Sequence, residues 1–167
     1  MKINNKGFTL IELMVTVAIF VTLSMMIIIN FRQNSPEKVL SNTVLDFSQS
    51  LRQAQNYALT CSNVSGLSYF GYGVFILNYS RYLIFADVNK NYIYDEGIDV
   101  VMEEKNFLAK VKNSRTGSST FFQCPSAKVC FNADCTGTND LIYDFKHTAG
   151  GTRSVILDLA TGRIQTE

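Results

Sequence analysis

A single acidic side chain, Glu12, interrupts a long apolar run near the start of the chain. From Phe8 to Ile29 the sequence contains no other ionisable group. A carboxylate placed in a membrane helix costs roughly 2.5–3.5 kcal/mol, so it normally has a partner. Cleavage before Phe8 would create a positive amine about one helical turn from Glu12. The Phe8 amine of a neighbouring copy is therefore the expected partner of Glu12.

The junction between Gly7 and Phe8 has the residue types that such a cleavage requires. Gly7 has no side chain to obstruct a peptidase, and Lys2 and Lys6 form a short basic leader before it. Loss of the leader would leave thirteen basic and fourteen acidic side chains, a formal charge of −1. This near-neutral balance gives no general indication of a nucleic acid or an acidic partner.

Four cysteines follow the apolar run and are candidates for redox chemistry. They are Cys61, Cys124, Cys130 and Cys135. If this part of the chain is exported, an even number of cysteines in an oxidising compartment favours disulfides, and three pairings stay open. Zinc is the weaker alternative, because zinc ligands usually come in closer pairs and export favours oxidation.

An acidic stretch has part of the spacing of a calcium loop. Its candidate oxygen ligands are Asp87, Asn89, Asn91, Asp95 and Asp99. Two departures count against calcium. Tyr92 stands where the loop requires glycine, and Ile98 occupies the twelfth position, which should carry the closing carboxylate. A polar hairpin tip held by Asx-turns is the alternative. We expect no other cofactor.

The sequence contains no recognisable active site. His147 is the only histidine, and its glycine-rich surroundings predict a surface loop. The stretch from Gly66 lacks the pattern of a nucleophile elbow, and Gly71-Tyr-Gly73 lacks the third glycine of a dinucleotide fingerprint. We therefore expect a protein that is not an enzyme.

The element that carries Glu12 is predicted to be a long helix. Residues 8–29 as a helix would reach about 33 Å, enough to cross a bilayer, and the two leader lysines predict a cytoplasmic N-terminus. Residues 30–62 form an amphipathic second half with one apolar stripe. Ser35-Pro36 is either a fresh helix start or a bend in one long helix, and we favour the bend. The stripe consists of Leu40, Val44, Phe47, Leu51, Ala54 and Ala58.

Residues 63–167 are predicted to form a globular β domain. Short apolar runs alternate there with clusters of turn-forming residues. The predicted fold class is α+β, with the long N-terminal helix packed on an antiparallel β-sheet domain. The predicted strands are Tyr72–Leu77, Arg81–Ala86, Val100–Phe107, Thr120–Gln123, Lys128–Phe131, Leu141–Phe145 and Ser154–Leu159.

The segment KGFTLIELMV, from Lys6 to Val15, resembles the prepilin leader motif of type IV pilins and type II secretion pseudopilins. The resemblance implies a pilin fold, removal of residues 1–7 by a prepilin peptidase after Gly7, and N-methylation of Phe8. It also implies assembly with other pilin subunits through Glu12. The protein would cross the bacterial inner membrane once, with its C-terminal domain in the periplasm, before it enters a filament.

Three further segments, SLRQAQNYALTCSN, FADVNKNYIYDEGID and TGRIQ, resemble the GspH/FimT family of minor pseudopilins. This resemblance implies a structural subunit of a type II secretion pseudopilus or a related type IV pilus, with a terminal strand at TGRIQ. The alternative is a filament-tip binding module that contacts DNA, a surface or a secreted substrate, with Tyr92 and Tyr94 among the loop residues available for contact. DNA is not the favoured partner, because family members bind it through basic C-terminal residues and only Arg153 and Arg163 are candidates here.

Overall fold

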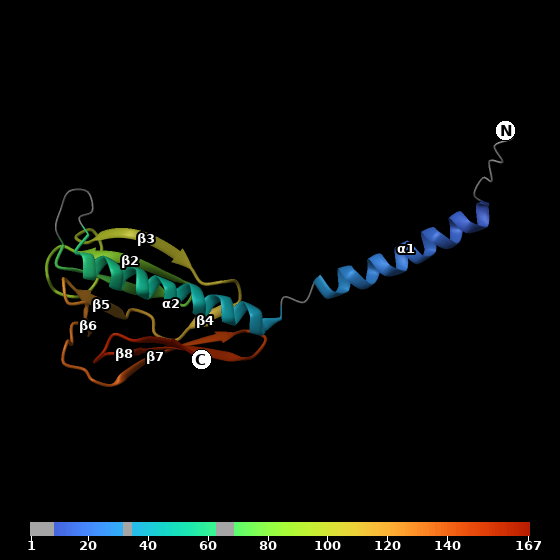
Figure 1. The fold of residues 1–167 in the computed structure, drawn as a ribbon. Helices are drawn as coiled ribbons and strands as arrows, with labels where there is room; N and C mark the ends of the chain where they lie inside the picture. Colours follow the sequence, from blue (N-terminus) through green and yellow to red (C-terminus); the bar gives the residue numbers. More distant parts are fainter. Residues whose placement is uncertain (1–8, 32–34, 63–68) are drawn as a thin grey trace. The chain divides into compact units, whose positions relative to one another are not determined.

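The computed structural model of the chain describes residues 9–31, 35–62 and 69–167. Two compact units make up the chain, Met1–Ser35 and Pro36–Glu167. The first contains helix α1, Leu10–Phe31, and the second contains helix α2 with two antiparallel sheets (Figure 1). The predicted α+β class and the helix expected at residues 8–29 are both confirmed, the helix from Leu10 onward.

Helix α2 spans Pro36–Thr60, so proline occupies its first position. Proline is well suited to this place because its missing N–H would have no partner within the helix. The structure therefore agrees with a fresh helix start at Ser35-Pro36. The bend that we favoured at Ser35-Pro36 stays a prediction, because residues 32–34, which precede it, lie outside the described residues.

The predicted apolar stripe of α2 is confirmed. All six of its residues are buried, together with Thr43, Ser48 and Ser50. Because this face packs against the sheets, α2 belongs to the same compact unit as the strands. The compact unit that contains the strands accordingly begins at Pro36 and includes α2.

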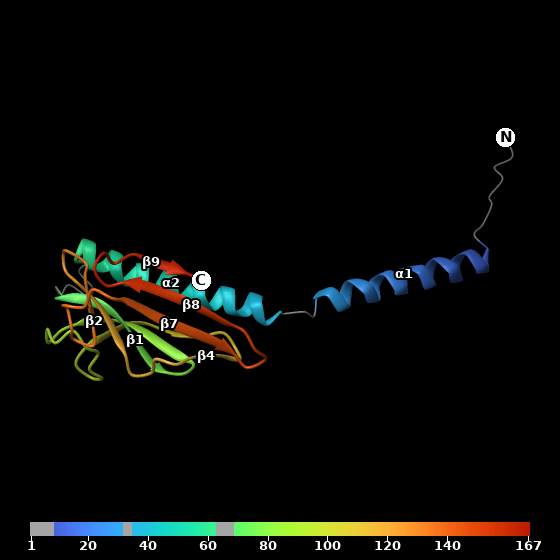
Figure 2. The ribbon, with the colours of Figure 1, turned by 90° about the horizontal axis from the view of Figure 1, so that it is seen from below.

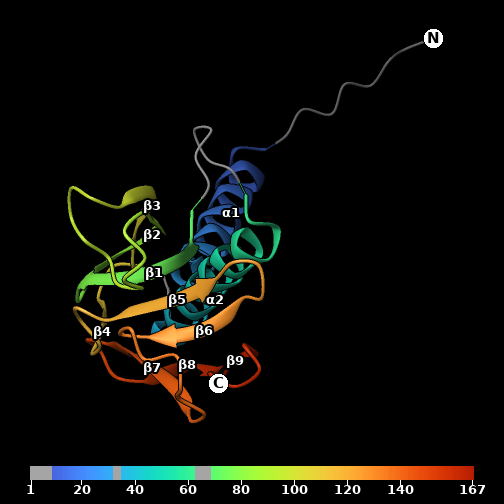
Figure 3. The same ribbon diagram turned by 90° about the vertical axis from the view of Figure 1, so that its left-hand side faces the viewer.

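The larger sheet has five strands in the order β3-β2-β1-β5-β6, all paired antiparallel. All five were predicted from their apolar runs. Figure 3 shows this sheet beside α2, with β3 and β6 at its two edges. The strands are β1 Gly71–Asn78, β2 Arg81–Asp87, β3 Val100–Asn106, β5 Ser119–Gln123 and β6 Lys128–Phe131.

The smaller sheet has four strands in the order β4-β7-β8-β9, and Figure 2 shows them along α2. Burial alternates strictly along β7, so one face is covered, as its sequence predicted. Strands β7 and β8 were predicted, β4 was not, and β9 lies where the TGRIQ resemblance implied a terminal strand. The bounds are β4 Val111–Asn113, β7 Asp140–His147, β8 Thr152–Asp158 and β9 Ile164–Thr166.

Phe47 of α2 lies at the centre of the main core and is fully buried. Its ring centroid is 5.2 Å from that of Tyr82 in the larger sheet and 5.0 Å from that of Tyr143 in the smaller sheet. A ring contact with Phe145 at 5.2 Å and one with Phe107 at 5.9 Å complete this aromatic group. One side chain of α2 thus joins the two sheets, and aromatic pairs of this kind add stability beyond the area that they bury.

Buried polar atoms on α2 have partners in the larger sheet. The hydroxyls of Ser50 and Tyr82 lie 3.0 Å apart, and Lys105 Nζ donates to Ser50 Oγ at 3.2 Å. Burial raises the pKa of Tyr82 to about 12, so its hydroxyl stays neutral at physiological pH. Such pairing matters because an unpaired buried hydroxyl would cost free energy on folding.

The face of the larger sheet that points away from α2 is also apolar. A second cluster forms there around Leu83, Phe85, Phe121 and Cys130. Gly71 and Gly73 of β1 leave room for it: a Cβ at Gly73 would lie 2.6 Å from the Phe85 ring, and one at Gly71 would lie 2.3 Å from the Phe121 ring. The glycines are therefore needed for close packing.

Candidate functional site

Glu12 lies in the first turn of α1 and closes a hydrogen-bonded ring with Thr9. Its Oε2 atom accepts from the Thr9 backbone N–H at 3.0 Å and from the Thr9 hydroxyl at 2.9 Å. The Glu12 N–H in turn donates to Thr9 Oγ1 at 3.3 Å. This reciprocal arrangement is a capping box, with Thr9 as the N-cap and Glu12 three residues later. Within one subunit, Glu12 therefore fixes the start of α1.

Thr9 is a site residue that the sequence reasoning missed. The spacing Thr-x-x-Glu before an apolar helix is the pattern of a capping box, and it was present in the sequence. The position of Glu12 in the apolar run by itself predicts only a role between subunits. Gly7 and Phe8, the predicted cleavage and methylation residues, lie outside the described residues.

The surface of α1 is apolar and uncovered. Every side chain from Thr9 to Met25 is exposed, and Phe20 has 76% of its surface accessible. Leu10, Ile11 and Leu13 surround Glu12 and are exposed to a similar degree. Large contiguous apolar surfaces of this kind mark a contact with another protein or a membrane.

Among the residues that the structure describes, no helix is both long enough and apolar enough to cross a membrane. The predicted membrane-spanning role of residues 8–29 is therefore not confirmed. In the described part of α1, Glu12 and the hydroxyls of Thr16, Thr22 and Ser24 interrupt the apolar surface, and each hydroxyl donates to a carbonyl of the helix itself.

Residues 2–28 match the family model of the prokaryotic N-terminal methylation motif. The motif marks a type IV pilin or pseudopilin. Its match covers the predicted cleavage junction, Glu12 and most of α1, and it implies assembly with other pilin subunits and processing by a prepilin peptidase. Neither curated proteins nor solved structures gave a match to the chain. The resemblance to the GspH/FimT family is accordingly not confirmed.

The acidic stretch is a compact hairpin tip between β2 and β3. Asp87 is fully buried, and its carboxylate accepts backbone N–H groups of Lys90 at 2.7 Å and Tyr92 at 3.1 Å. Asp99 accepts those of Val88 at 3.0 Å and Asp95 at 2.8 Å. Burial raises the pKa of Asp87, while the backbone donors oppose that shift.

The two asparagines of the stretch also bind within it. Asn89 and Asn91 donate their Nδ2 groups to Asp95 Oδ2 at 2.7 and 2.6 Å. Both carboxylate oxygens of Asp87 and of Asp99, and one of Asp95, thus accept protein N–H groups, an arrangement typical of a polar hairpin tip. In the described ranges, no group of three or more His, Cys, Asp or Glu side chains could hold a metal ion. Calcium binding stays a prediction.

Tyr92, which occupies the glycine position of a calcium loop, adopts the glycine-like backbone conformation at φ 69°. This region is costly for a bulky residue. The ring offsets the strain, because it packs 5.6 Å from the Phe70 ring and 5.3 Å from the Phe121 ring of the outer cluster. Tyr94 similarly lies 5.1 Å from Phe75. These two tyrosines cover the sheet, so the residues considered for ligand contact also hold the hairpin in place.

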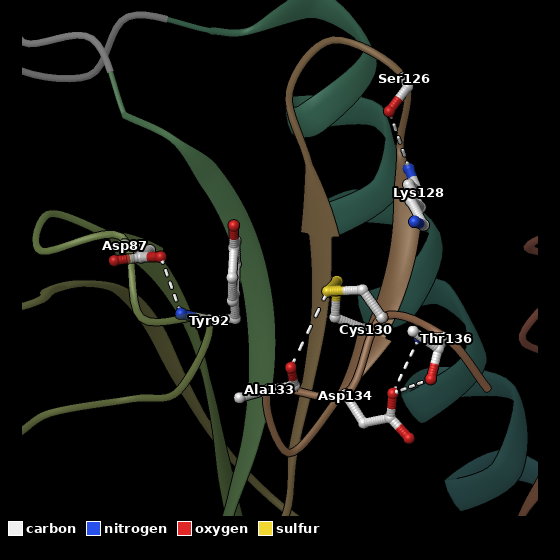
Figure 4. The surroundings of a disulfide bond; sticks show 9 residues. Asp87, Tyr92, Ser126, Lys128, Cys130, Ala133, Asp134 and Thr136 are labelled. Carbon is white, nitrogen blue, oxygen red and sulfur yellow. Dashed lines mark hydrogen bonds between the residues drawn. A yellow bond between two sulfur atoms is a disulfide. The ribbon is translucent and has the colours of Figure 1, made fainter.

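Cys130 and Cys135 form a disulfide that closes the turn after β6 (Figure 4). Within that turn, Asp134 Oδ1 accepts from the Thr136 hydroxyl at 2.6 Å. Hydrogen bonds from Thr136 hold the pKa of Asp134 below its ordinary value. The predicted disulfide chemistry is confirmed for this pair, whereas Cys61 and Cys124 are free thiols in the structure.

The two candidate DNA contacts are engaged within the domain. Arg153 forms an ion pair with Glu37 at 3.3 Å, and the Arg163 guanidinium donates to the Gln165 amide oxygen at 2.7 Å when that amide is oriented to accept.

The prediction that His147 lies on a surface loop is wrong. It ends β7 opposite Val111, is only 6% exposed, and accepts the Ala149 N–H at Nδ1, because the strand extends beyond the apolar run that predicted it.

Proposed function

We propose that this protein is a minor structural subunit of a type II secretion pseudopilus or a related type IV pilus. The observation that carries the proposal is the uncovered apolar surface of α1, which has Glu12 in its first turn and lies within the matched methylation motif. A surface of this kind requires a partner, and neighbouring copies of the same helix supply one. The protein acts by assembly and not as an enzyme.

In this proposal a prepilin peptidase cuts after Gly7 and Phe8 becomes the methylated N-terminus. Before assembly the subunit is anchored in the inner membrane, with the N-terminus in the cytoplasm and the β domain outside. Lys2 and Lys6 before the apolar run support this orientation, since positive residues stay on the cytoplasmic side.

Glu12 has two roles in this proposal, a cap within its own subunit and a charge pair between subunits. In the single subunit its carboxylate accepts two hydrogen bonds from Thr9. On assembly, the Phe8 amine of a neighbouring subunit pairs with the same carboxylate. Oxygen atoms of an ionised carboxylate accept several donors at once, so the pair between subunits forms without loss of the cap.

A Glu12→Gln substitution separates these two roles. Glutamine supports a capping box as glutamate does, but it carries no charge. We expect filament entry to be impaired by Glu12→Gln as strongly as by Glu12→Ala, with the subunit still present in membranes. The matched control is Asp46→Ala, which removes an exposed carboxylate from α2. Normal incorporation of Glu12→Gln would refute the charge pair and leave capping as the only role of Glu12.

The filament-tip binding module is the second candidate, and the DNA version has little support. Both candidate arginines already bind within the domain, and the chain without its leader is near neutral. Electrostatic DNA binding would strengthen as salt is lowered. Retention of the purified protein on DNA at low salt, lost in an Arg153→Ala and Arg163→Ala double variant, would revive this function.

A further inference from the structure

The two free cysteines occupy equivalent places at the ends of two elements. Cys61 is the first residue after α2, and Cys124 is the first residue after β5. Both are half-buried. They are 63 positions apart in the sequence, so only the fold brings them to the same end of the domain.

Strand β1 holds both cysteine segments. The Tyr72 hydroxyl donates to the carbonyl of Ser62, the residue next to Cys61. Tyr72 is also paired in register with Phe122, two residues before Cys124, and the Cys124 N–H donates to the Phe70 carbonyl at 3.0 Å. Backbone and side-chain contacts of Phe70 and Tyr72 therefore link the two cysteine segments.

The Cys61 and Cys124 thiols are close enough to influence each other, and both also act on the Tyr72 hydroxyl that joins their segments. Burial is the main cause that raises the pKa of Cys124 to about 12, and the neighbouring Cys61 thiol adds to it. The Cys124 thiol, held neutral in this way, is a poor nucleophile, so it does not have the character of a catalytic or sensing cysteine. Two adjacent, half-buried thiols in an oxidising compartment instead favour a structural bond.

We propose that Cys61 and Cys124 form a second disulfide of the domain, which ties the end of α2 to the end of β5. The proposal rests on the export that the proposed function includes. Formation of the Sγ–Sγ bond removes two protons and two electrons from the thiols. A thiol–disulfide oxidoreductase provides the oxidising disulfide, forms a mixed disulfide with one cysteine and leaves as a dithiol when the other attacks.

Tryptic digestion without reductant tests this pairing directly. Membranes that contain the full-length protein are treated with acid to stop thiol–disulfide exchange. Free thiols are then alkylated, and the protein is cleaved with trypsin. Trypsin places Cys61 in peptide 53–81, Cys124 in peptide 116–128, and both Cys130 and Cys135 in peptide 129–146. We expect peptide 53–81 linked to peptide 116–128, with the link lost on reduction, and peptide 129–146 oxidised internally. In a Cys124→Ser variant, Cys61 should become fully alkylated while peptide 129–146 stays oxidised.

The alternative outcomes separate the disulfide from export. Alkylated Cys61 and Cys124 beside an oxidised peptide 129–146 would overturn the second disulfide and leave export intact. Alkylation of all four cysteines would overturn it together with export, on which the proposed function depends. A link from either Cys61 or Cys124 to peptide 129–146 would overturn the proposed pairing.

Discussion

The two helices of this protein have similar lengths, 22 residues in α1 and 25 in α2, but their apolar side chains differ in burial. In α2 the apolar stripe is buried against both sheets. In α1 every side chain from Leu10 to Met25 is exposed, although most are apolar. The difference shows that α2 completes its own domain, whereas the apolar surface of α1 marks a contact with another protein or a membrane.

The sharpest test of this difference compares a phenylalanine from each helix. Phe47→Ala removes a fully buried ring that joins the two sheets, so we expect a loss of about 3–5 kcal/mol in the free energy of unfolding. Phe20→Ala removes an exposed ring from α1 and should leave domain unfolding unchanged while filament entry falls. Urea unfolding of detergent-purified protein measures the first effect, and the subunit content of isolated filaments measures the second. Equal unfolding losses in both variants would contradict the comparison.

A smaller effect is expected on the outer face of the larger sheet. Gly73→Ala would place a Cβ 2.6 Å from the Phe85 ring and 2.7 Å from the Thr120 carbonyl oxygen. We expect overpacking to cost about 1–3 kcal/mol, measured as a lower unfolding midpoint. Gly97→Ala is the control, since a Cβ there meets nothing within 4 Å and only its φ of +82° causes strain. A Gly97 variant that is the less stable of the two would show that the outer cluster is loosely packed.

The capping box predicts an effect confined to α1. Thr9→Val keeps the size of the side chain but removes the hydroxyl that binds Glu12, which should destabilise the helix start by about 1 kcal/mol. Filament entry should fall partly, and domain unfolding should not change. Thr9→Ser retains the hydroxyl and should behave as the wild type. Equal filament entry of the Val and Ser variants would show that the cap has no role in assembly.

The smallest expected effect concerns the turn that brings β9 against α2. Asp158 accepts the N–H groups of Ala160 and Thr161, and hydrogen bonds from Thr161 are the main cause that holds its pKa below the ordinary value of 3.8. Because the folded state favours the ionised form, its contribution is present above pH 3.8 and is lost as the pH falls through the lowered pKa.

Asp158→Asn isolates this charge, because asparagine can still accept both turn hydrogen bonds. The variant should be slightly less stable than the wild type at pH 7, and the difference should vanish in acid below the lowered pKa. Thermal unfolding midpoints of the two proteins across that pH range give the measurement. A difference that is unchanged in acid would mean that the charge does not contribute.

Local periodicity predicted much of the domain. The six residues of the α2 stripe repeat every three or four positions, and all are buried. Seven strands were found from apolar runs of at least four residues. Strand β4 was missed because its three residues are too few to show alternation. His147 was misplaced because its burial depends on pairing with β4, which is a contact between distant segments.

The candidate site was predicted less evenly. The Glu12 position followed from a lone carboxylate in an apolar run. Its capping box with Thr9 was missed, because both residues also belong to the leader motif, which explained them without a cap. Sequence left three cysteine pairings open, and only the fold places Cys61 beside Cys124. The roles of Tyr92 and Tyr94 in covering the sheet were also beyond the sequence, since their ring partners come from separate strands.

Mass spectrometry of the N-terminal peptide tests assembly through α1 most directly. It should be applied to membranes and to sheared surface filaments from the same cells. The account predicts a peptide that begins at methylated Phe8: in the sheared fraction if the filament is an extracellular pilus, and only in membranes if it is a short pseudopilus. An N-terminus still at Met1 in both fractions would contradict processing, and with it the role of Glu12 and the α1 surface in a filament.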